Sequence, residues 1–232
     1  MEKYKSAVLP RYQGKKYAIP DIHGCLETLN ALLRKINLRK EDQLFILGDF
    51  IGRGYSSVGV TDRIIGLISE GYQVYPIRGN HEEEIVQLSE GQNYFFNYNK
   101  IEDEILDGFF DHNHKLKPVY LNFFSSLPYI IEIEDFIMVH AGIDFSAQDP
   151  FTDFNSMLYI RNFRYDEKTA KNKNIVHGHS PKSLSFIQNA IGKSEKIIPI
   201  DNGCVWKEFE GMGNLLCLEL GNMELTIQPN ID

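Results

Sequence analysis

The stretch Leu44-Phe45-Ile46-Leu47-Gly48-Asp49-Phe50-Ile51-Gly52-Arg53-Gly54 decides the fold of this 232-residue chain. Its first four residues are apolar and predict a short buried strand, and a glycine-rich turn follows directly. Asp49 therefore lies where the strand ends. Because ligands of open α/β sheets bind at the carboxyl ends of strands, Asp49 is a candidate functional residue.

Two further stretches repeat this order of strand, turn and polar residue. Tyr17-Ala18-Ile19 precedes Pro20-Asp21-Ile22-His23-Gly24, and residues 74–77 precede Arg78-Gly79-Asn80-His81-Glu82. Three successive strands are thus expected to direct their polar ends toward one place.

Helices are expected between these strands. Apolar side chains recur at helical spacing over residues 25–36, and a second helix is expected to begin at Ser56 or Ser57, either of which is a candidate N-cap. A hairpin that turns at Glu134-Asp135 is expected from the strands at residues 129–134 and 136–139. Further strands are expected at residues 175–176 and 196–200, and a last hairpin over residues 215–227. The alternation of strands and helices predicts an α/β (α+β) fold.

The composition is that of an ordinary globular protein, with 43% hydrophobic and 24% charged residues. We expect a single domain over residues 1–232, because no linker or internal repeat divides the chain. A formal net charge of −8 without a basic run argues against nucleic acid as a partner. The absence of a signal-peptide core and of any stretch of about 18 apolar residues predicts a cytoplasmic location and no membrane partner. Three cysteines without a CxxC pair indicate neither a zinc knuckle nor a disulfide framework.

An aromatic-rich insert is expected at residues 91–128, where the regular alternation stops. Two interpretations are open: helices that pack their aromatic side chains on the core, which is the commoner arrangement, or a cap that faces the substrate. The aromatic residues concerned are Tyr94, Phe95, Phe96, Tyr98, Phe109, Phe110, Phe123 and Phe124.

Polar residues able to bind metals follow five of the expected strands. They offer carboxylate, amide and imidazole groups but no thiolate, which suits divalent cations such as Mn²⁺, Fe²⁺ or Zn²⁺. Six ligands are too many for one tetrahedral ion, but they suit two ions that share a bridging carboxylate. The set is Asp21, His23, Asp49, Asn80, His140 and His179.

These motifs resemble those of the phosphoprotein phosphatase branch of the calcineurin-like metallophosphoesterases, especially its small bacterial and phage members. That family is marked by Gly-Asp-x-His-Gly, Gly-Asp-x-x-Asp-Arg-Gly and Gly-Asn-His-Glu, followed by two separated histidines. The resemblance extends from Asp21 to His179 and implies a four-layer αββα metallophosphoesterase sandwich. It also implies a first metal bound by Asp21 and His23 and a bridging role for Asp49. The second metal would be held by Asn80, His140 and His179.

The resemblance also implies which residues contact the substrate. Arg53 and Arg161 match the arginines that hold the substrate phosphate, although Arg164 lies close to Arg161 in the sequence. Asn80 would contact the same phosphate. His81 matches the general acid that protonates the leaving oxygen.

Two positions depart from the family pattern. Pro20 replaces the first glycine, which supplies backbone and no ligand. Gly52 replaces the second aspartate, which in the family orients the histidine that matches His81. A small residue at this position resembles the symmetrical dinucleoside tetraphosphatases, whose leaving group is a phosphate of low pKa and needs less protonation.

Three other features were interpreted from the sequence. Asp201 is expected either to orient a ligand histidine or to form a turn in Asp-Asn-Gly. His177 is left out of the site, because Gly178 indicates that the strand already turns. The run Glu82-Glu83-Glu84 is expected to be the solvated start of a helix.

The leading functional hypothesis is a phosphomonoesterase of the serine/threonine protein phosphatase type, in which water activated by two metals attacks phosphorus. The alternative is a symmetrical dinucleoside tetraphosphate hydrolase, and a non-catalytic metal-binding module is the third hypothesis. The partner is accordingly a phosphorylated protein, a small phosphoester or a nucleotide. Mn²⁺ is the expected ion, with Fe²⁺, Zn²⁺ and Ni²⁺ as alternatives.

Overall fold

Two five-stranded sheets form the centre of the molecule, and the structure, a computed structural model, describes residues 6–8, 14–90 and 106–232. The strand order of the first sheet is β10 (Glu224–Pro229), β9 (Asn214–Glu219), β2 (Lys16–Ile19), β3 (Gln43–Ile46) and β4 (Gln73–Pro76). β2, β3 and β4 are parallel, and β9 is antiparallel to both of its neighbours. The parallel strands therefore end at the same edge of the sheet.

The second sheet is mixed. Its strand order is β1 (Ser6–Val8), β5 (Ile130–Glu132), β6 (Phe136–Val139), β7 (Asn174–His177) and β8 (Ile197–Pro199). β5 and β6 form the expected antiparallel hairpin, while β6, β7 and β8 are parallel. β1 pairs in parallel with β5 and was not predicted, because only three residues form it and they show no alternation of polar and apolar side chains.

The two sheets pack face to face on a buried apolar layer. Ala18, Phe45 and Leu47 from the first sheet share this layer with Met138 and Val176 from the second, and each is less than 1% exposed. Successive side chains of a strand point to opposite faces of the sheet. The residues that precede and follow each of these along its strand therefore face the helices.

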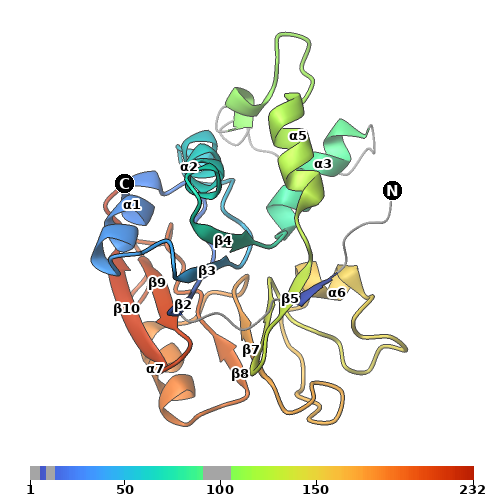
Figure 1. Ribbon diagram of the computed structural model, residues 1–232, viewed down its shortest axis with the longest axis vertical. Helices are drawn as coiled ribbons and strands as arrows, with labels where there is room; N and C mark the ends of the chain where they lie inside the picture. Colours follow the sequence, from blue (N-terminus) through green and yellow to red (C-terminus); the bar gives the residue numbers. More distant parts are fainter. Residues whose placement is uncertain (1–5, 9–13, 91–105) are drawn as a thin grey trace.

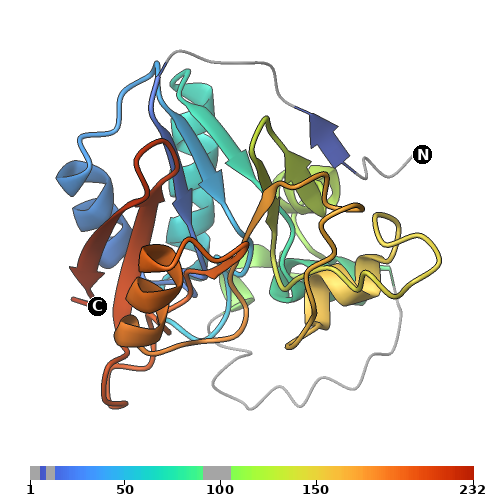
Figure 2. The ribbon, with the colours of Figure 1, turned by 90° about the horizontal axis from the view of Figure 1, so that it is seen from below.

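Helices cover the outer faces of both sheets, as Figures 1 and 2 show. The first sheet carries α1 (Leu26–Lys35), α2 (Ser57–Ser69), α3 (Asn80–Ser89) and α5 (Pro118–Ser126). The second sheet carries α6 (Phe154–Tyr159), while α7 (Leu184–Gly192) packs against β8. The order helix, sheet, sheet, helix confirms the four-layer αββα sandwich. None of the helices in the described ranges is both long and apolar enough to cross a bilayer.

The N-terminus of α2 differs from the prediction. Ser56 occupies the N-cap position, but its side chain makes no capping hydrogen bond. The hydroxyl of Ser57 instead accepts a hydrogen bond from the backbone N–H of Gly52 at 2.9 Å. Ser57 thus fixes the glycine-rich turn after β3.

The described part of the expected insert packs on the core. A short 3-10 helix, η1 (Asp107–Phe109), and α5 bring Phe109 and Phe124 together, with ring centroids 5.5 Å apart and both side chains fully buried. Phe50, which follows Asp49, lies 6.0 Å from Phe124. Core packing is therefore the correct interpretation for residues 106–128. Tyr94, Phe95, Phe96 and Tyr98 lie outside the described residues.

Candidate metal centre

The candidate ligands lie just beyond the ends of five strands that belong to both sheets. Asp21, Asp49 and Asn80 follow β2, β3 and β4 of the first sheet. His140 and His179 follow β6 and β7 of the second. All six predicted ligands come together at this edge, and five of them line one pocket. Those five are Asp21, His23, Asp49, Asn80 and His179.

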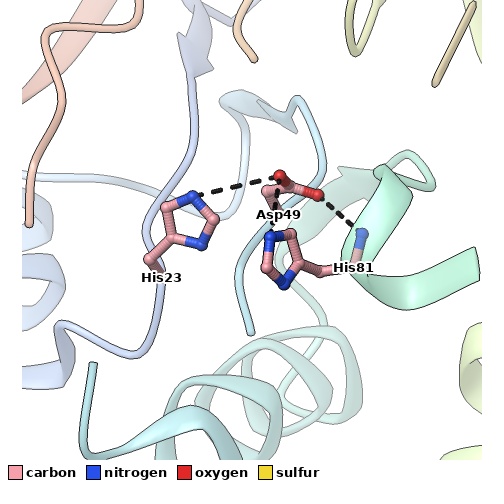
Figure 3. A group of neighbouring side chains, drawn as sticks. All are labelled: His23, Asp49 and His81. Carbon is pink, nitrogen blue, oxygen red and sulfur yellow. Dashed lines mark hydrogen bonds and ion pairs between the residues drawn. The ribbon is translucent and has the colours of Figure 1, made fainter. Parts of the chain in front are cut away.

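Asp49 occupies the middle of the cluster (Figure 3). Its Oδ2 atom lies 3.5 Å from His140 Nε2 and 3.9 Å from His23 Nε2. Its Oδ1 atom accepts a hydrogen bond from the backbone N–H of His81 at 3.0 Å. One carboxylate therefore faces ligand atoms on both sides, which is the placement that a bridging ligand requires.

Two backbone carbonyl groups orient the histidines. His23 Nδ1 lies 3.0 Å from the carbonyl oxygen of Ile51, and His140 Nδ1 lies 2.8 Å from that of Leu47. Because a carbonyl oxygen can only accept, each ring carries its proton on Nδ1. The unprotonated Nε2 atoms are left to face Asp49, as metal ligands would.

The second group of ligands converges around His140. Its Nε2 atom lies 3.1 Å from Asn80 Oδ1 and 3.1 Å from His179 Nδ1. Asp49 Oδ2 lies 3.5 Å from the same atom, so the ligand atoms of Asp49, Asn80 and His179 all lie within 3.5 Å of His140 Nε2. The first group lies around His23, whose Nε2 atom is 3.8 Å from Asp21 Oδ2. His81 lies beside the first group, with its Nε2 atom 3.9 Å from Asp49 Oδ2.

The charges at this edge favour cations. Burial and the negative charges of Asp201 and Asp49 raise the pKa of Asp21 well above its usual value. Burial and Asp49 also raise the pKa of Asp201 to about 7. The pKa of His23 and that of His179 are each lowered to about 3, mainly by burial, so both imidazoles are neutral. Neutral nitrogen donors beside mutually repelling carboxylates fit divalent cations, which would relieve the repulsion.

Several residues of the site share a strained backbone conformation with positive φ. His23, Asp49 and His179 have φ values of 48°, 45° and 64°, in the left-handed region that non-glycine residues rarely adopt. Arg53 has a φ of 61°. Such conformations cost about 1–2 kcal/mol each and concentrate at functional sites.

The sequence matches a known family over most of the length of the chain. The family model for calcineurin-like phosphoesterases matches residues 15–210. The chain belongs to the calcineurin-like phosphoesterase family. Together with the two ligand groups, family membership indicates divalent metal ions as the cofactor.

Several relatives have similar sequences. A symmetrical bis(5'-nucleosyl)-tetraphosphatase of Vibrio campbellii is 29% identical over 136 residues, which covers 55% of this chain and 44% of the relative. One from Chromobacterium violaceum is 31% identical over 128 residues, which covers 55% of this chain and 43% of the relative. The match thus spans less than half the length of either curated relative.

Solved structures show the same fold. A protein assigned provisionally as a diadenosine tetraphosphatase superposes with a TM-score of 0.69 and 20% identity, over 99% of both chains. A protein serine/threonine phosphatase from Saccharomyces cerevisiae gives a TM-score of 0.66 and 16% identity, over 99% of this chain and 84% of that one. At these identities the likeness concerns the fold alone.

Gly52 occupies the position of the motif aspartate, and His81 leaves no room there for a side chain. A Cβ atom at Gly52, which has a φ of 82°, would lie only 2.4 Å from His81 Nδ1. The imidazole of His81 thus fills the space beside the glycine and packs edge-to-face on His23, with ring centroids 4.9 Å apart. A Gly52→Asp exchange would therefore have to displace His81 before a new carboxylate could orient it.

The two predicted arginines reach the same pocket, which has a volume of about 340 Å³. Arg53 extends from the glycine-rich turn, and Arg161 follows α6. Arg164 is not among the residues that line this pocket. The geometry therefore favours Arg161 over Arg164 as the second phosphate ligand.

The prediction of a solvated acidic run is wrong for Glu82 and Glu83. Glu82 is 0% exposed, and its carboxylate accepts hydrogen bonds from the backbone N–H groups of Asp49, Phe50, Ile51 and Gly79 at 2.8–3.3 Å. Glu83 pairs with Arg78 at 2.6 Å. The family motif Gly-Asn-His-Glu includes Glu82, and this was the available signal. The charge pattern of the sequence does not indicate that Glu82 binds the turn at residues 49–51.

Asp201 and His177 have structural contacts. Asp201 Oδ1 accepts a hydrogen bond from the backbone N–H of Gly203 at 2.7 Å, as the turn interpretation predicted. Asp201 also lines the pocket near Asp21, and its buried Oδ2 atom has no hydrogen-bond partner among the residues that the structure describes. His177 is buried against the ring of Phe163 and does not line the pocket.

Proposed function

We propose that this protein is a metal-dependent phosphoesterase that hydrolyses phosphate esters with two divalent cations, Mn²⁺ being the expected ion. One observation carries the proposal: the carboxylate of Asp49 faces ligand atoms of both groups, at 3.5 Å from His140 and 3.9 Å from His23. Two bound cations would supply Lewis-acid stabilisation of the phosphoryl group and a water-derived nucleophile near neutral pH.

The residues of the chain have separate tasks in this proposal. Asp21 and His23 would hold one cation, and Asp49 would contact both. The other cation would be held by Asn80, His140 and His179. Backbone contacts from Ile51 and Leu47 keep the ligand nitrogens of His23 and His140 unprotonated and directed inward.

The substrate phosphate would be held by the two arginines of the pocket, with Asn80 as a further contact. A guanidinium group presents several N–H donors in a plane, which suits the oxygens of a phosphoryl group. His81 is placed to donate a proton to the leaving oxygen, since its side chain lines the same pocket. Binding of phosphate by Arg53 and Arg161 would orient the leaving group toward His81.

Two substrate classes remain candidates. A phosphomonoester, as in serine/threonine protein phosphatases, is the leading one. A symmetrical dinucleoside tetraphosphate is the second, because Gly52 leaves His81 without an orienting carboxylate and several relatives bear that name. A phosphate leaving group has a low pKa, so its departure depends less on proton donation by His81.

Replacement of Asp49 by Asn tests the metal site. We expect the variant to lose both Mn²⁺, measured by mass spectrometry of the metal content, and phosphate release. Asp144→Asn is the matched control, because the Asp144 carboxylate lies in an exposed turn and accepts hydrogen bonds from the backbone N–H and the hydroxyl of Ser146. Full metal content and unchanged turnover in Asp49→Asn would refute the bridging role.

The substrate class is tested with the same protein. Rates of Mn²⁺-dependent phosphate release from p-nitrophenyl phosphate and a phosphothreonine peptide are compared with the rate of diadenosine tetraphosphate cleavage. Faster hydrolysis of the monoesters supports the leading class. Faster cleavage of the dinucleotide supports the second class, and bound Mn²⁺ without hydrolysis of any substrate would support a metal-binding module.

A further inference from the structure

The pocket has an apolar side opposite the metal ligands. It is formed by the segment between β8 and β9, from which Trp206, Phe209 and Met212 line the same 340 Å³ space as His23 and Asp49. Pro181 completes this side. Trp206 and Phe209, called here the aromatic wall, contact each other edge-to-face, with ring centroids 5.7 Å apart and an interplanar angle of 81°. No step of the proposed hydrolysis uses these rings.

Hydrogen bonds of one buried side chain hold this segment in place. Asn202 is 0% exposed, and its Nδ2 atom donates to the carbonyl oxygens of Lys182 and Gly211, at 2.8 Å in both cases. Its Oδ1 atom accepts from Asn214 Nδ2 at 2.7 Å. Asn202 thus joins both ends of the segment, so the aromatic wall is held in a fixed position.

Trp206 is also fixed by close packing on the backbone. Gly203 has a φ of 61°, and a Cβ atom there would lie 2.6 Å from Trp206 Cδ1. Only glycine permits this approach. The ring of Trp206 therefore rests on the backbone of the segment, which restricts its movement.

Arg53 connects the aromatic wall with the phosphate site. Its guanidinium carbon lies 5.3 Å from the centroid of the Trp206 ring, within the range of a cation–π contact. The residue that we assign to the substrate phosphate therefore also lies against the wall. A group attached to that phosphate would extend along Trp206.

Phe209 is 53% exposed, which is unusual for a side chain of its size. An exposed aromatic ring beside a polar pocket is typical of a position where a ligand supplies the missing contact. Flat rings are the groups that stack most favourably on Trp and Phe side chains.

We propose that the aromatic wall binds a planar aromatic ring carried by the phosphorylated substrate, with Arg53 holding the phosphate between ring and metal ligands. This proposal rests on the proposed phosphoesterase function for its choice of phosphorylated ligands. A nucleobase and the phenyl group of an aryl ester offer the same flat ring, and separate probes distinguish them.

The test is calorimetric binding to the Mn²⁺-loaded protein, which requires no turnover. Phenylphosphonate is compared with methylphosphonate, and the non-hydrolysable phosphonate analogue of adenosine monophosphate with that of ribose 5-phosphate, so that each pair differs chiefly in its ring. We expect at least one ring-bearing ligand to bind about tenfold more tightly than its ring-free partner, which is within the range reported for stacking on aromatic side chains. A preference in the first pair identifies a phenyl site, and one in the second pair a nucleobase site.

Substitutions assign the preference to the aromatic wall. Trp206→Leu and Phe209→Ala should each reduce it at least threefold while ring-free ligands keep their affinity. Phe186→Ala is the matched control, because Phe186 is 50% exposed but does not line the pocket. Phe209→Ala is expected to fold normally because half of the ring is already exposed.

Three results would overturn the proposal. They are equal binding within both pairs by the unmodified protein, an unchanged preference in both wall variants, and an equal loss of affinity for ring-bearing and ring-free ligands. The last result would mean that Trp206 only positions Arg53. A ring preference in a protein that hydrolyses nothing would refute the phosphoesterase function and leave the ring site intact.

Discussion

Replacement of Gly52 by Ala tests how the position of His81 depends on the missing side chain. The added Cβ atom would lie 2.4 Å from His81 Nδ1 and 2.9 Å from Cε1, whereas ordinary contacts begin at 3.4 Å. The imidazole must therefore move by about 1 Å, a displacement that can reduce catalysis on the order of 100-fold. At a φ of 82° the alanine also adds strain of about 1–2 kcal/mol to the folded state.

Substrates with different leaving groups distinguish the displacement of His81 from the backbone strain at residue 52. If His81 donates a proton to the leaving oxygen, kcat should fall about 100-fold for phenyl phosphate but much less for p-nitrophenyl phosphate, whose leaving oxygen needs little protonation. Gly71→Ala is the matched control, because Gly71 has a φ of 88° with no atom within 4 Å of the added Cβ. It imposes similar backbone strain without a collision.

The measurements are kcat with Mn²⁺ and the thermal unfolding temperature, each for Gly52→Ala and Gly71→Ala. We expect similar losses of stability from strain in the two variants, with a larger loss of kcat in Gly52→Ala alone. Equal kcat values in the two variants would refute the argument from the collision. An equal decrease for both substrates in Gly52→Ala would refute proton donation by His81.

Two further predictions concern stability. Glu82→Gln replaces one carboxylate oxygen by an NH₂ group, which cannot accept a hydrogen bond. Two of the four buried backbone N–H groups then lose their acceptor, so the free energy of unfolding should fall by about 2–6 kcal/mol. Chemical denaturation in EDTA checks this, with exposed Glu70→Gln as control, and equal stabilities would show that the carboxylate is dispensable. Asp232→Ala removes an acceptor for the backbone N–H groups of Glu27 and Thr28 at the start of α1, and should lower the melting temperature by an amount equivalent to about 0.5–2 kcal/mol. An unchanged melting temperature would mean that water replaces this cap at no cost.

The strands, and the residues that gather where they end, could be predicted from the sequence because each combination of strand and polar residue is local. Asp49 follows an apolar run after a single glycine, and His23 and Asn80 occupy short motifs, so none of the three depends on knowledge of distant contacts. The hairpin of β5 and β6 was predicted for the same reason. The resemblance to a family then supplied the order of the layers, which periodicity alone would have left open.

Features that depend on distant parts of the chain were not predicted. Glu82 binds the turn after β3, more than 30 residues earlier, and its burial has no counterpart in the local pattern of charge. Trp206 is the only tryptophan of the chain, but its contact with Arg53 joins segments that neither strand nor helix periodicity relates. Asp232 replaces the side-chain cap that Cys25 does not provide to α1. In each case a long-range hydrogen bond or ring contact determined the outcome.

The division of the ligands between the two sheets has a consequence for the order in which the molecule assembles. His179 donates its backbone N–H to Asp21, a partner 158 positions earlier, so the site cannot exist until most of the chain has been synthesised. The cation held by Asn80, His140 and His179 could not act as an early template, because its two histidines belong to the second sheet and the first sheet alone leaves its site incomplete. It would instead join the two sheets after each has formed, as a late cross-link does. Chelation of a mature molecule should then loosen the seam between the sheets before it melts either sheet.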